Sequence, residues 1–402
     1  MTNATMTERT TSTAIGCPRG FIAAGTACGI KASGADDLAL ILAPKGATAA
    51  AMFTRNLVKA APIVISQQKI AASHGRFRAL VINSGCANAA TGEQGFANAD
   101  AVMDALAAHL KCDSNEALMN STGVIGEHLS SQLIIDALPK LIASCSESGL
   151  ARAAVAIHTT DTRLKMAERT VSHGGRTCRV VGIAKGAGMI HPNMATTIGV
   201  IMTDAKGEAP VLDRMLRSAV DRSFHRITVD GDTSTNDSVF LLASGDAGAF
   251  PEEILQPAIT GVARDLAEMV VRDGEGAAKL IRVRVSGAST AVDALQVAQT
   301  VASSLLVRTS VAGGDPNWGR ILAAAGRSGV SIDPDIVALH VNDLSLFADG
   351  KPAGTPKRAL EKAYASDEVI LDIDLHQGDA SDEFLTCDLT EGYVRVNADY
   401  TS

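Results

Sequence analysis

The chain has 402 residues and a formal net charge of −8, and 46% of its residues are hydrophobic but only 3% aromatic. A chain of this length usually divides into two lobes, which here must be built mainly from small and aliphatic side chains. The acidic balance, without a run of Lys or Arg in the sequence, argues against nucleic acid as a partner.

Nothing in the sequence predicts targeting or membrane attachment. Residues 1–14, MTNATMTERTTSTA, have neither the basic nor the apolar region of a signal peptide. No apolar stretch reaches the ~18 residues that a membrane span needs. The seven cysteines form no CxxC pair and no Cys/His cluster, a distribution typical of reduced thiols. We therefore expect a cytoplasmic protein without a bound metal.

Strands and helices are predicted to alternate along the chain. Apolar runs bounded by Gly, Ser and Asn predict strands at 37–43, 61–67 and 77–83. Segments with the helical period predict helices at 96–110, 130–144, 210–222, 251–272 and 290–306. Further β-branched runs predict strands at 177–184, 196–205, 279–287, 335–341, 368–375 and 393–400.

This alternation predicts the fold class. We expect an α/β fold of mixed α+β type, a layered sandwich of mixed sheets and helices. The four strands predicted from residue 279 onward interleave with the helix at 290–306. This predicts a smaller C-terminal α+β lobe over approximately residues 280–402.

A threonine pair stands at the start of the strand predicted at 196–205. Thr196 and Thr197 follow a turn that contains Gly186, Gly188 and Pro192. A threonine hydroxyl is a weak nucleophile and needs an adjacent base. If the chain were cut before a threonine, its own α-amine, with an unperturbed pKa of about 8, could be that base. Without such a cut, the pair only starts a strand.

The residues around this pair resemble the signature of a known family. The segment from Lys185 to Thr196, KGAGMIHPNMAT, is similar to that of the ornithine acetyltransferase family, also called bifunctional glutamate N-acetyltransferase or ArgJ. Other matching segments are spread over nearly the whole chain, at 25–31, 83–92, 121–126, 159–162, 226–237, 273–279, 315–320 and 397–402. The resemblance supports the layered fold, of the DmpA/ArgJ type.

The resemblance implies self-cleavage between Ala195 and Thr196. Residues 1–195 would become an α-chain and residues 196–402 a β-chain that begins at the nucleophile. The family's cut directly after the alanine favours Thr196 over Thr197. The two cleavage products are expected to assemble as an α2β2 heterotetramer.

Other site residues follow from the matching segments. The resemblance makes Thr122 and Gly123 the oxyanion hole, through a hydroxyl and a backbone N–H. It also makes six residues substrate-binding: Thr159, Lys185, Thr196, Glu275, Asn397 and Ser402. Glu275 could hold the terminal ammonium of ornithine, since a buried cation needs a carboxylate partner. Neither a cofactor nor a metal is implied.

The expected activity is transfer of an acetyl group from N-acetyl-L-ornithine to L-glutamate by a ping-pong mechanism. The sequence leaves open whether acetyl-CoA is also a donor. It also leaves open two alternatives: an N-terminal-nucleophile amidohydrolase or aminopeptidase, and a non-catalytic homologue that binds amino acids without cleaving itself.

Three other polar features receive a structural interpretation. His191 is expected to be a turn residue and Cys86 a small core residue. The run DGDTSTND, with Asp230, Asp232 and Asp237, resembles a metal site but lacks the spacing of an EF-hand loop. The resemblance implies that it is structural or lies near the site, without a required metal.

Overall fold

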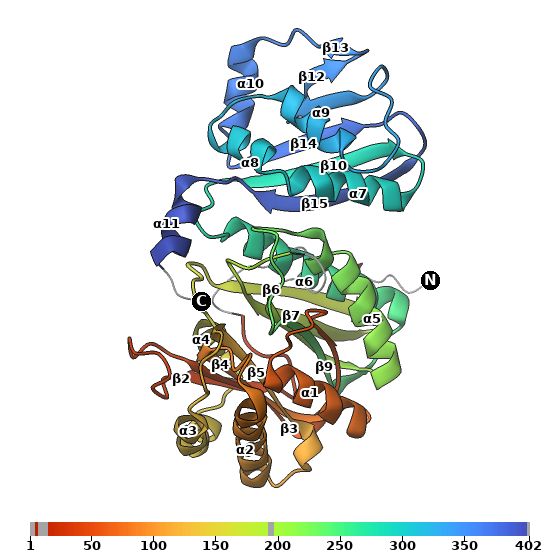
Figure 1. Ribbon diagram of the computed structural model, residues 1–402. Coiled ribbons are helices and arrows are strands. Elements are labelled where there is room, and N and C mark those ends of the chain that lie inside the picture. Colours follow the sequence, from red (N-terminus) through yellow and green to blue (C-terminus); the bar gives the residue numbers. More distant parts are fainter. Residues whose placement is uncertain (1–4, 7–14, 192–196, 400–402) are drawn as a thin grey trace.

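The computed structural model describes residues 5–6, 15–191 and 197–399. Two mixed β-sheets with helices packed on them make up this part of the chain (Figure 1). The first sheet has the order β1-β6-β7-β8-β9-β3-β4-β5, with β2 also paired to β3. The second has the order β13-β12-β11-β14-β10-β15.

The first lobe contains the larger sheet. Its strands are β1 (Thr5–Met6), β2 (Ile22–Thr26), β3 (Leu38–Phe53), β4 (Arg76–Cys86), β5 (Ala117–Val124), β6 (Lys165–His173), β7 (Arg176–Lys185), β8 (Ile198–Lys206) and β9 (Ser238–Ala249). Its helices are α1 (Ala61–Ala72), α2 (Gly92–Leu110), α3 (Ser131–Ala143), α4 (Leu150–Ala156), α5 (Ala209–Asp221) and α6 (Glu252–Arg272), with short 3₁₀ turns at Ser114–Glu116 and Phe224–Arg226.

Alternating side chains divide this lobe into layers. On β4, Leu80 and Ile82 join a core that also contains Ile183 of β7 and Val200 of β8, so the two halves of the sheet pack face to face. The opposite face of β4, with Val81, is covered by α2 and α3. Helices α5 and α6 cover the outer face of β6 to β9. The result is the predicted layered sandwich of helices and mixed sheets.

The second sheet carries its own core. Its strands are β10 (Leu280–Ala288), β11 (Ala338–Val341), β12 (Leu344–Ala348), β13 (Lys351–Pro352), β14 (Glu368–Asp374) and β15 (Ala380–Cys387). The helices beside it are α7 (Ala291–Ala302), α8 (Leu305–Ala312), α9 (Trp318–Gly326) and α10 (Lys357–Tyr364), and α11 (Glu391–Asp399) follows β15. Helix α11 leaves the second sheet and lies beside the first lobe (Figure 1).

Three predicted elements were wrong. The run at 61–67 is the first part of α1, because Pro62 at its first turn favours a helix start and a short apolar run has no diagnostic period. The described part of the run at 393–400, residues 393–399, lies in α11 rather than in a strand. The helix at 290–306 divides into α7 and α8, since the Ser304 hydroxyl accepts the N–H of Val307 and starts a new helix.

Two whole-chain properties were searched over the described residues. Among them, no helix is long and apolar enough to cross a membrane. The same residues contain no group of three or more His, Cys, Asp or Glu side chains that could hold a metal ion.

Candidate active site

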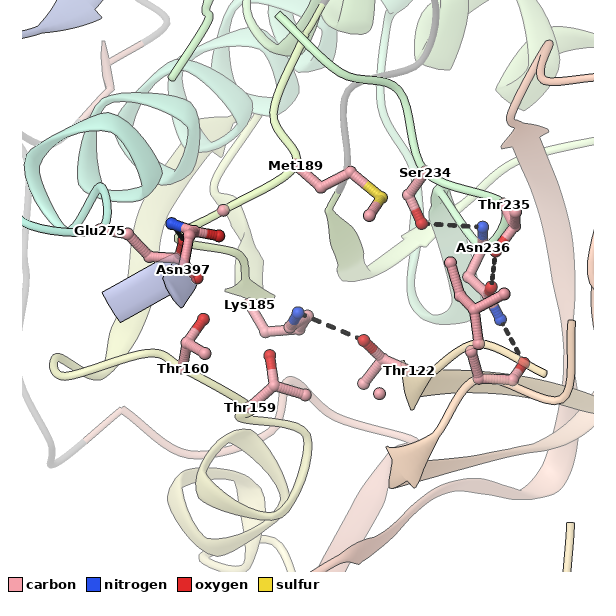
Figure 2. A pocket seen from close by; sticks show the side chains of 14 residues that line it. Thr122, Thr159, Thr160, Lys185, Met189, Ser234, Thr235, Asn236, Glu275 and Asn397 are labelled. Atoms are coloured by element: carbon pink, nitrogen blue, oxygen red, sulfur yellow. Dashed lines mark hydrogen bonds between the residues drawn. The ribbon is translucent and has the colours of Figure 1, made fainter. Parts of the chain in front are cut away.

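A pocket in the first lobe gathers six of the predicted site residues. They come from five separate parts of the chain, and they are Thr122, Gly123, Thr159, Lys185, Glu275 and Asn397 (Figure 2). Thr122 and Gly123 end β5, Lys185 ends β7, and Asn397 lies on α11. Because parallel strands β4 and β5 end at the same edge, loops from distant segments meet there.

Gly123 is a position that requires glycine. Its φ of 132° lies in the region that favours glycine, and a Cβ placed there would lie 2.3 Å from the carbonyl carbon of Gly85. The two strand ends therefore approach each other closely. Thr122, the residue before it, is buried and directs its side chain to the pocket.

Lys185 is the buried cation of the pocket. Its Nζ donates a hydrogen bond to Thr122 Oγ1 at 3.2 Å. Since the Thr122 oxygen accepts this bond, the proton of the Thr122 hydroxyl remains free to be donated to another acceptor. Burial lowers the pKa of the Lys185 ammonium, and Asp161 is the largest of the charges that oppose this shift.

Asp161 is a buried carboxylate that the sequence analysis did not identify. Its Oδ1 accepts the N–H of Gly186 at 2.6 Å and the ammonium of Lys165 at 2.7 Å, and its Oδ2 accepts the N–H of Thr159 at 3.1 Å. Although burial acts to raise its pKa, Lys185 and Lys165 hold the pKa of this carboxyl well below its usual range. Asp161 thus joins two pocket segments. The matching segment TTDT, which contains it, was the available signal.

Glu275 and Asn397 form the other side of the pocket. Asn397 Nδ2 donates to Glu275 Oε2 at 2.8 Å, and the Glu275 N–H donates to the carbonyl of Ala187 at 3.0 Å. The carboxylate lies against Gly188, where a Cβ would come within 2.4 Å of the Glu275 Cδ. The pocket therefore has a carboxylate at one side and the Lys185 ammonium at another, which suits a ligand with groups of both charges.

The run DGDTSTND lines the pocket as well. Ser234, Thr235 and Asn236 are buried there, and Asn236 Nδ2 donates to the carbonyls of Ala87 and Ser121 at 2.7 and 2.8 Å. These bonds fix the loop against the end of β5. From the resemblance, this run was expected to be structural or to lie near the site.

Three predicted site residues lie outside the described residues. They are Ala195 and Thr196 at the expected cut, and Ser402 at the end of the chain. The alternative nucleophile Thr197 is described: it is buried, and its hydroxyl donates to the carbonyl of Lys185 at 2.5 Å. This contact joins the second residue after the expected cut to the end of β7.

Two residues with a structural interpretation can also be placed. His191 Nδ1 is 3.1 Å from Thr228 Oγ1, and burial lowers the pKa of its imidazole. Cys86 is buried in the core beneath α2, and burial raises the pKa of its thiol. Neither residue lines the pocket.

The class of protein indicated by the fold and the pocket is an enzyme that acts on a small molecule. The fold is a layered α/β structure, and the pocket holds a buried lysine, a carboxylate and close-packed strand ends. The ArgJ family model matches residues 22–402. Two named relatives agree with it. An arginine biosynthesis bifunctional protein ArgJ from Parasynechococcus marenigrum is 44% identical over 96% of this chain and 94% of its own length. An arginine biosynthesis bifunctional protein ArgJ, mitochondrial, from Schizosaccharomyces japonicus is 40% identical over 96% of this chain and 93% of its own length. The chain belongs to the ArgJ family, a family of arginine-biosynthesis enzymes.

Solved structures are also similar to parts of the chain. An ornithine acetyltransferase from Mycobacterium tuberculosis, in complex with ornithine, is 39% identical, with a TM-score of 0.41 over 47% of this chain and 98% of that chain. An ArgJ structure from Bacillus halodurans is 36% identical, with a TM-score of 0.48 over 49% of this chain and 96% of that chain.

Proposed function

We propose that this chain is a self-cleaving acetyltransferase that moves an acetyl group from N-acetyl-L-ornithine to L-glutamate through an ester on Thr196. The observation that carries the proposal is the convergence of six sequence-predicted residues on one pocket (Figure 2). Family membership supports it, since the relatives are named arginine biosynthesis bifunctional proteins.

The first step of the proposal is self-cleavage. Thr196 Oγ loses its proton and attacks the carbonyl carbon of Ala195, and the peptide C–N bond breaks as its nitrogen takes up a proton. The resulting ester is hydrolysed by water, which leaves a carboxylate on Ala195 and a free hydroxyl and α-amine on Thr196. The products are an α-chain, 1–195, and a β-chain, 196–402.

The second step is acetyl transfer. The α-amine of Thr196 takes the hydroxyl proton while Oγ attacks the acetyl carbonyl, and the negative charge that develops on oxygen is stabilised by the Thr122 hydroxyl and the Gly123 N–H. The bond to the ornithine nitrogen breaks and the amine leaves with the proton. The amine of glutamate then attacks the ester, and the hydroxyl is regenerated.

The remaining pocket residues bind the substrate in this proposal. Glu275, held by Asn397, accepts hydrogen bonds from the side-chain ammonium of ornithine, and Thr159 lines the same pocket. Lys185 orients the Thr122 hydroxyl and places a positive charge in the pocket, which lowers the pKa of the α-amine. Ser402 is proposed as a further substrate contact by family resemblance.

The test of the proposal is intact-mass spectrometry of the denatured protein beside Thr196→Ala. We expect two fragments that meet at Ala195/Thr196 in the wild type and one full-length chain in the variant. An assay with N-acetylornithine and labelled glutamate should then give labelled N-acetylglutamate. Release of free acetate without glutamate acetylation would favour an amidohydrolase, and an uncut chain that binds amino acids without turnover would favour a binding protein.

Three finer statements extend the proposal. We infer that the cleavage products assemble as α2β2, which native mass spectrometry measures. We infer a cytoplasmic location, which cell fractionation tests. A bifunctional enzyme would also acetylate glutamate from acetyl-CoA, and assays with each donor alone distinguish it from an enzyme confined to recycling the acetyl group.

A further inference from the structure

Asp230 holds the turn that precedes the proposed cleavage site. One of its carboxylate oxygens, Oδ2, accepts the N–H of Met189. The other, Oδ1, accepts the N–H of Ile190 at 2.8 Å and that of Asp232 at 3.2 Å. Asp230 does not line the pocket. The acidic run that resembled a metal site in the sequence thus binds backbone of its own chain.

The turn at Met189 needs such support. Met189 has a φ of 57°, a left-handed conformation that a long side chain rarely adopts and that costs free energy unless its surroundings fix it. Its N–H has the Asp230 carboxylate as acceptor, and its side chain lines the pocket (Figure 2). The acidic side chain therefore stabilises a strained residue at the pocket wall.

Both described sides of the segment 192–196 are tied down. Before it, the carbonyl of Ile190 accepts the N–H of Val229 at 2.8 Å and the hydroxyl of Thr228 at 3.0 Å. After it, the hydroxyl of Thr197 donates to the carbonyl of Lys185. Asp230 completes the first of these anchors, because it binds the two N–H groups that Ile190 and its neighbour present.

We propose that Asp230 is a positioning residue for self-cleavage, fixing the direction in which the chain leaves Ile190 toward the Ala195–Thr196 bond. This inference rests on the proposed function, and the bonds made and broken are those of the acyl shift described above. Asp230 exchanges no proton in that reaction and acts through the turn that it holds. Geometry matters there, since the Thr196 hydroxyl must meet the preceding carbonyl within a narrow range of distances and angles.

Burial makes the Asp230 carboxylate costly to keep ionised. Burial raises the pKa of Asp230 to about 6, and the three N–H groups offset this only in part. The titratable groups near it are Asp232 on its own turn, Tyr393 on α11 and Cys387 on β15. Because the folded pKa is raised, stability from its protonated form is present below the unfolded pKa of 3.8 and is lost as the pH rises through about 6.

The test is Asp230→Asn, followed by intact mass spectrometry of the full chain over time at neutral pH. Asparagine has the same shape as aspartate but only one acceptor oxygen, and its NH₂ group cannot accept a backbone N–H. The turn therefore loses one of the two oxygens that hold it. We expect cleavage to be about 10- to 100-fold slower than in the wild type. The melting temperature should change little, because loss of the buried charge offsets the loss of one N–H acceptor.

The matched control is Asp232→Asn, two residues further on. It removes the same charge from an exposed side chain, while the bond to Asp230 comes from the backbone N–H and is retained. This control should cleave at the wild-type rate. A wild type that never cleaves removes the proposed function itself. If the wild type cleaves, the proposed function stands and three results would contradict the role of Asp230. They are equally fast cleavage in Asp230→Asn, equally slow cleavage in both Asn variants, and a loss of cleavage that is explained by a lowered melting temperature.

Discussion

Asp161 shows how one side chain can organise several parts of a pocket. Its carboxylate binds the backbone at Thr159 and Gly186 and pairs with Lys165, whose ammonium also contacts Asp273 at 2.5 Å. The Lys165 and Asp161 side chains are both fully buried. Ion pairs at such depth are stable only when every oxygen and proton finds a partner, and the backbone N–H groups complete the set.

Replacing Asp161 by Asn should lower the free energy of unfolding by about 3 kcal/mol at neutral pH, because a buried ammonium then keeps only one carboxylate. The folded pKa of Asp161 is depressed, so the stability from its ionised form is fully present above the unfolded value of 3.8 and is lost only as the pH falls toward the folded pKa. Urea unfolding of both proteins should therefore give a constant difference from about pH 8 to pH 5. A difference that closes near pH 6 would contradict this assignment.

At the scale of elements, the turn between β7 and β8 determines where Glu275 lies. Gly188 has the Glu275 carboxylate directly over its Cα, and the Ala187 carbonyl binds the Glu275 N–H. The segment after α6 and the turn after β7 are thus fitted to each other. Helix α11 packs on the same segment, since a Cβ on Gly276 would lie 2.2 Å from the Tyr393 nitrogen.

Gly188→Ala should displace the Glu275 carboxylate while leaving the fold intact, because the added methyl would lie 2.4 Å from the Glu275 Cδ. Loss of a charge-assisted hydrogen bond, about 1.5–3 kcal/mol, should raise the KM for N-acetylornithine tenfold or more. Steady-state kinetics of the acetyl transfer measure it. The control is Gly326→Ala on α9, where a Cβ meets no atom within 4 Å; an equal rise in KM there would contradict the explanation.

The sequence predicted long elements better than it predicted short elements and supporting residues. Helix α6 and strand β4 have clear periods or continuous apolar runs, so their existence did not depend on tertiary contacts. The run at 393–400 alternates like a strand, but its described residues, 393–399, are helical in α11. No residue of α11 is buried, so no core contact favours the alternating pattern. The roles of Asp161 and Asp230 could not be predicted, because they depend on which backbone N–H groups the fold brings to each carboxylate.

For the whole molecule, α6 joins the two sheets through charged side chains. Arg282 on β10 contacts Glu268 of α6 at 3.1 Å, Glu368 of β14 at 2.9 Å and Glu383 of β15 at 3.3 Å. Arg272 of α6 also contacts Glu268 and Glu368. Burial acts to raise the pKa of Glu268, but the two arginines hold it below its usual value. Arg282 is thus the common partner of three carboxylates from both lobes.

Arg282→Met should lower the free energy of unfolding by about 2 kcal/mol, less than a fully buried pair would lose because the partners keep some contact with water. The carboxylates left behind repel one another only when ionised, so the deficit should shrink as the pH falls through the range where glutamate takes up protons. Urea titrations at several pH values measure it. The matched control is Arg284→Met on the same strand. Its side chain is half-exposed and lies 3.9 Å from Asp372, so the change should alter stability by less than about 0.5 kcal/mol. Equal losses for both arginines, or a deficit that grows on acidification, would mean that the contacts of Arg282 do not couple the two lobes.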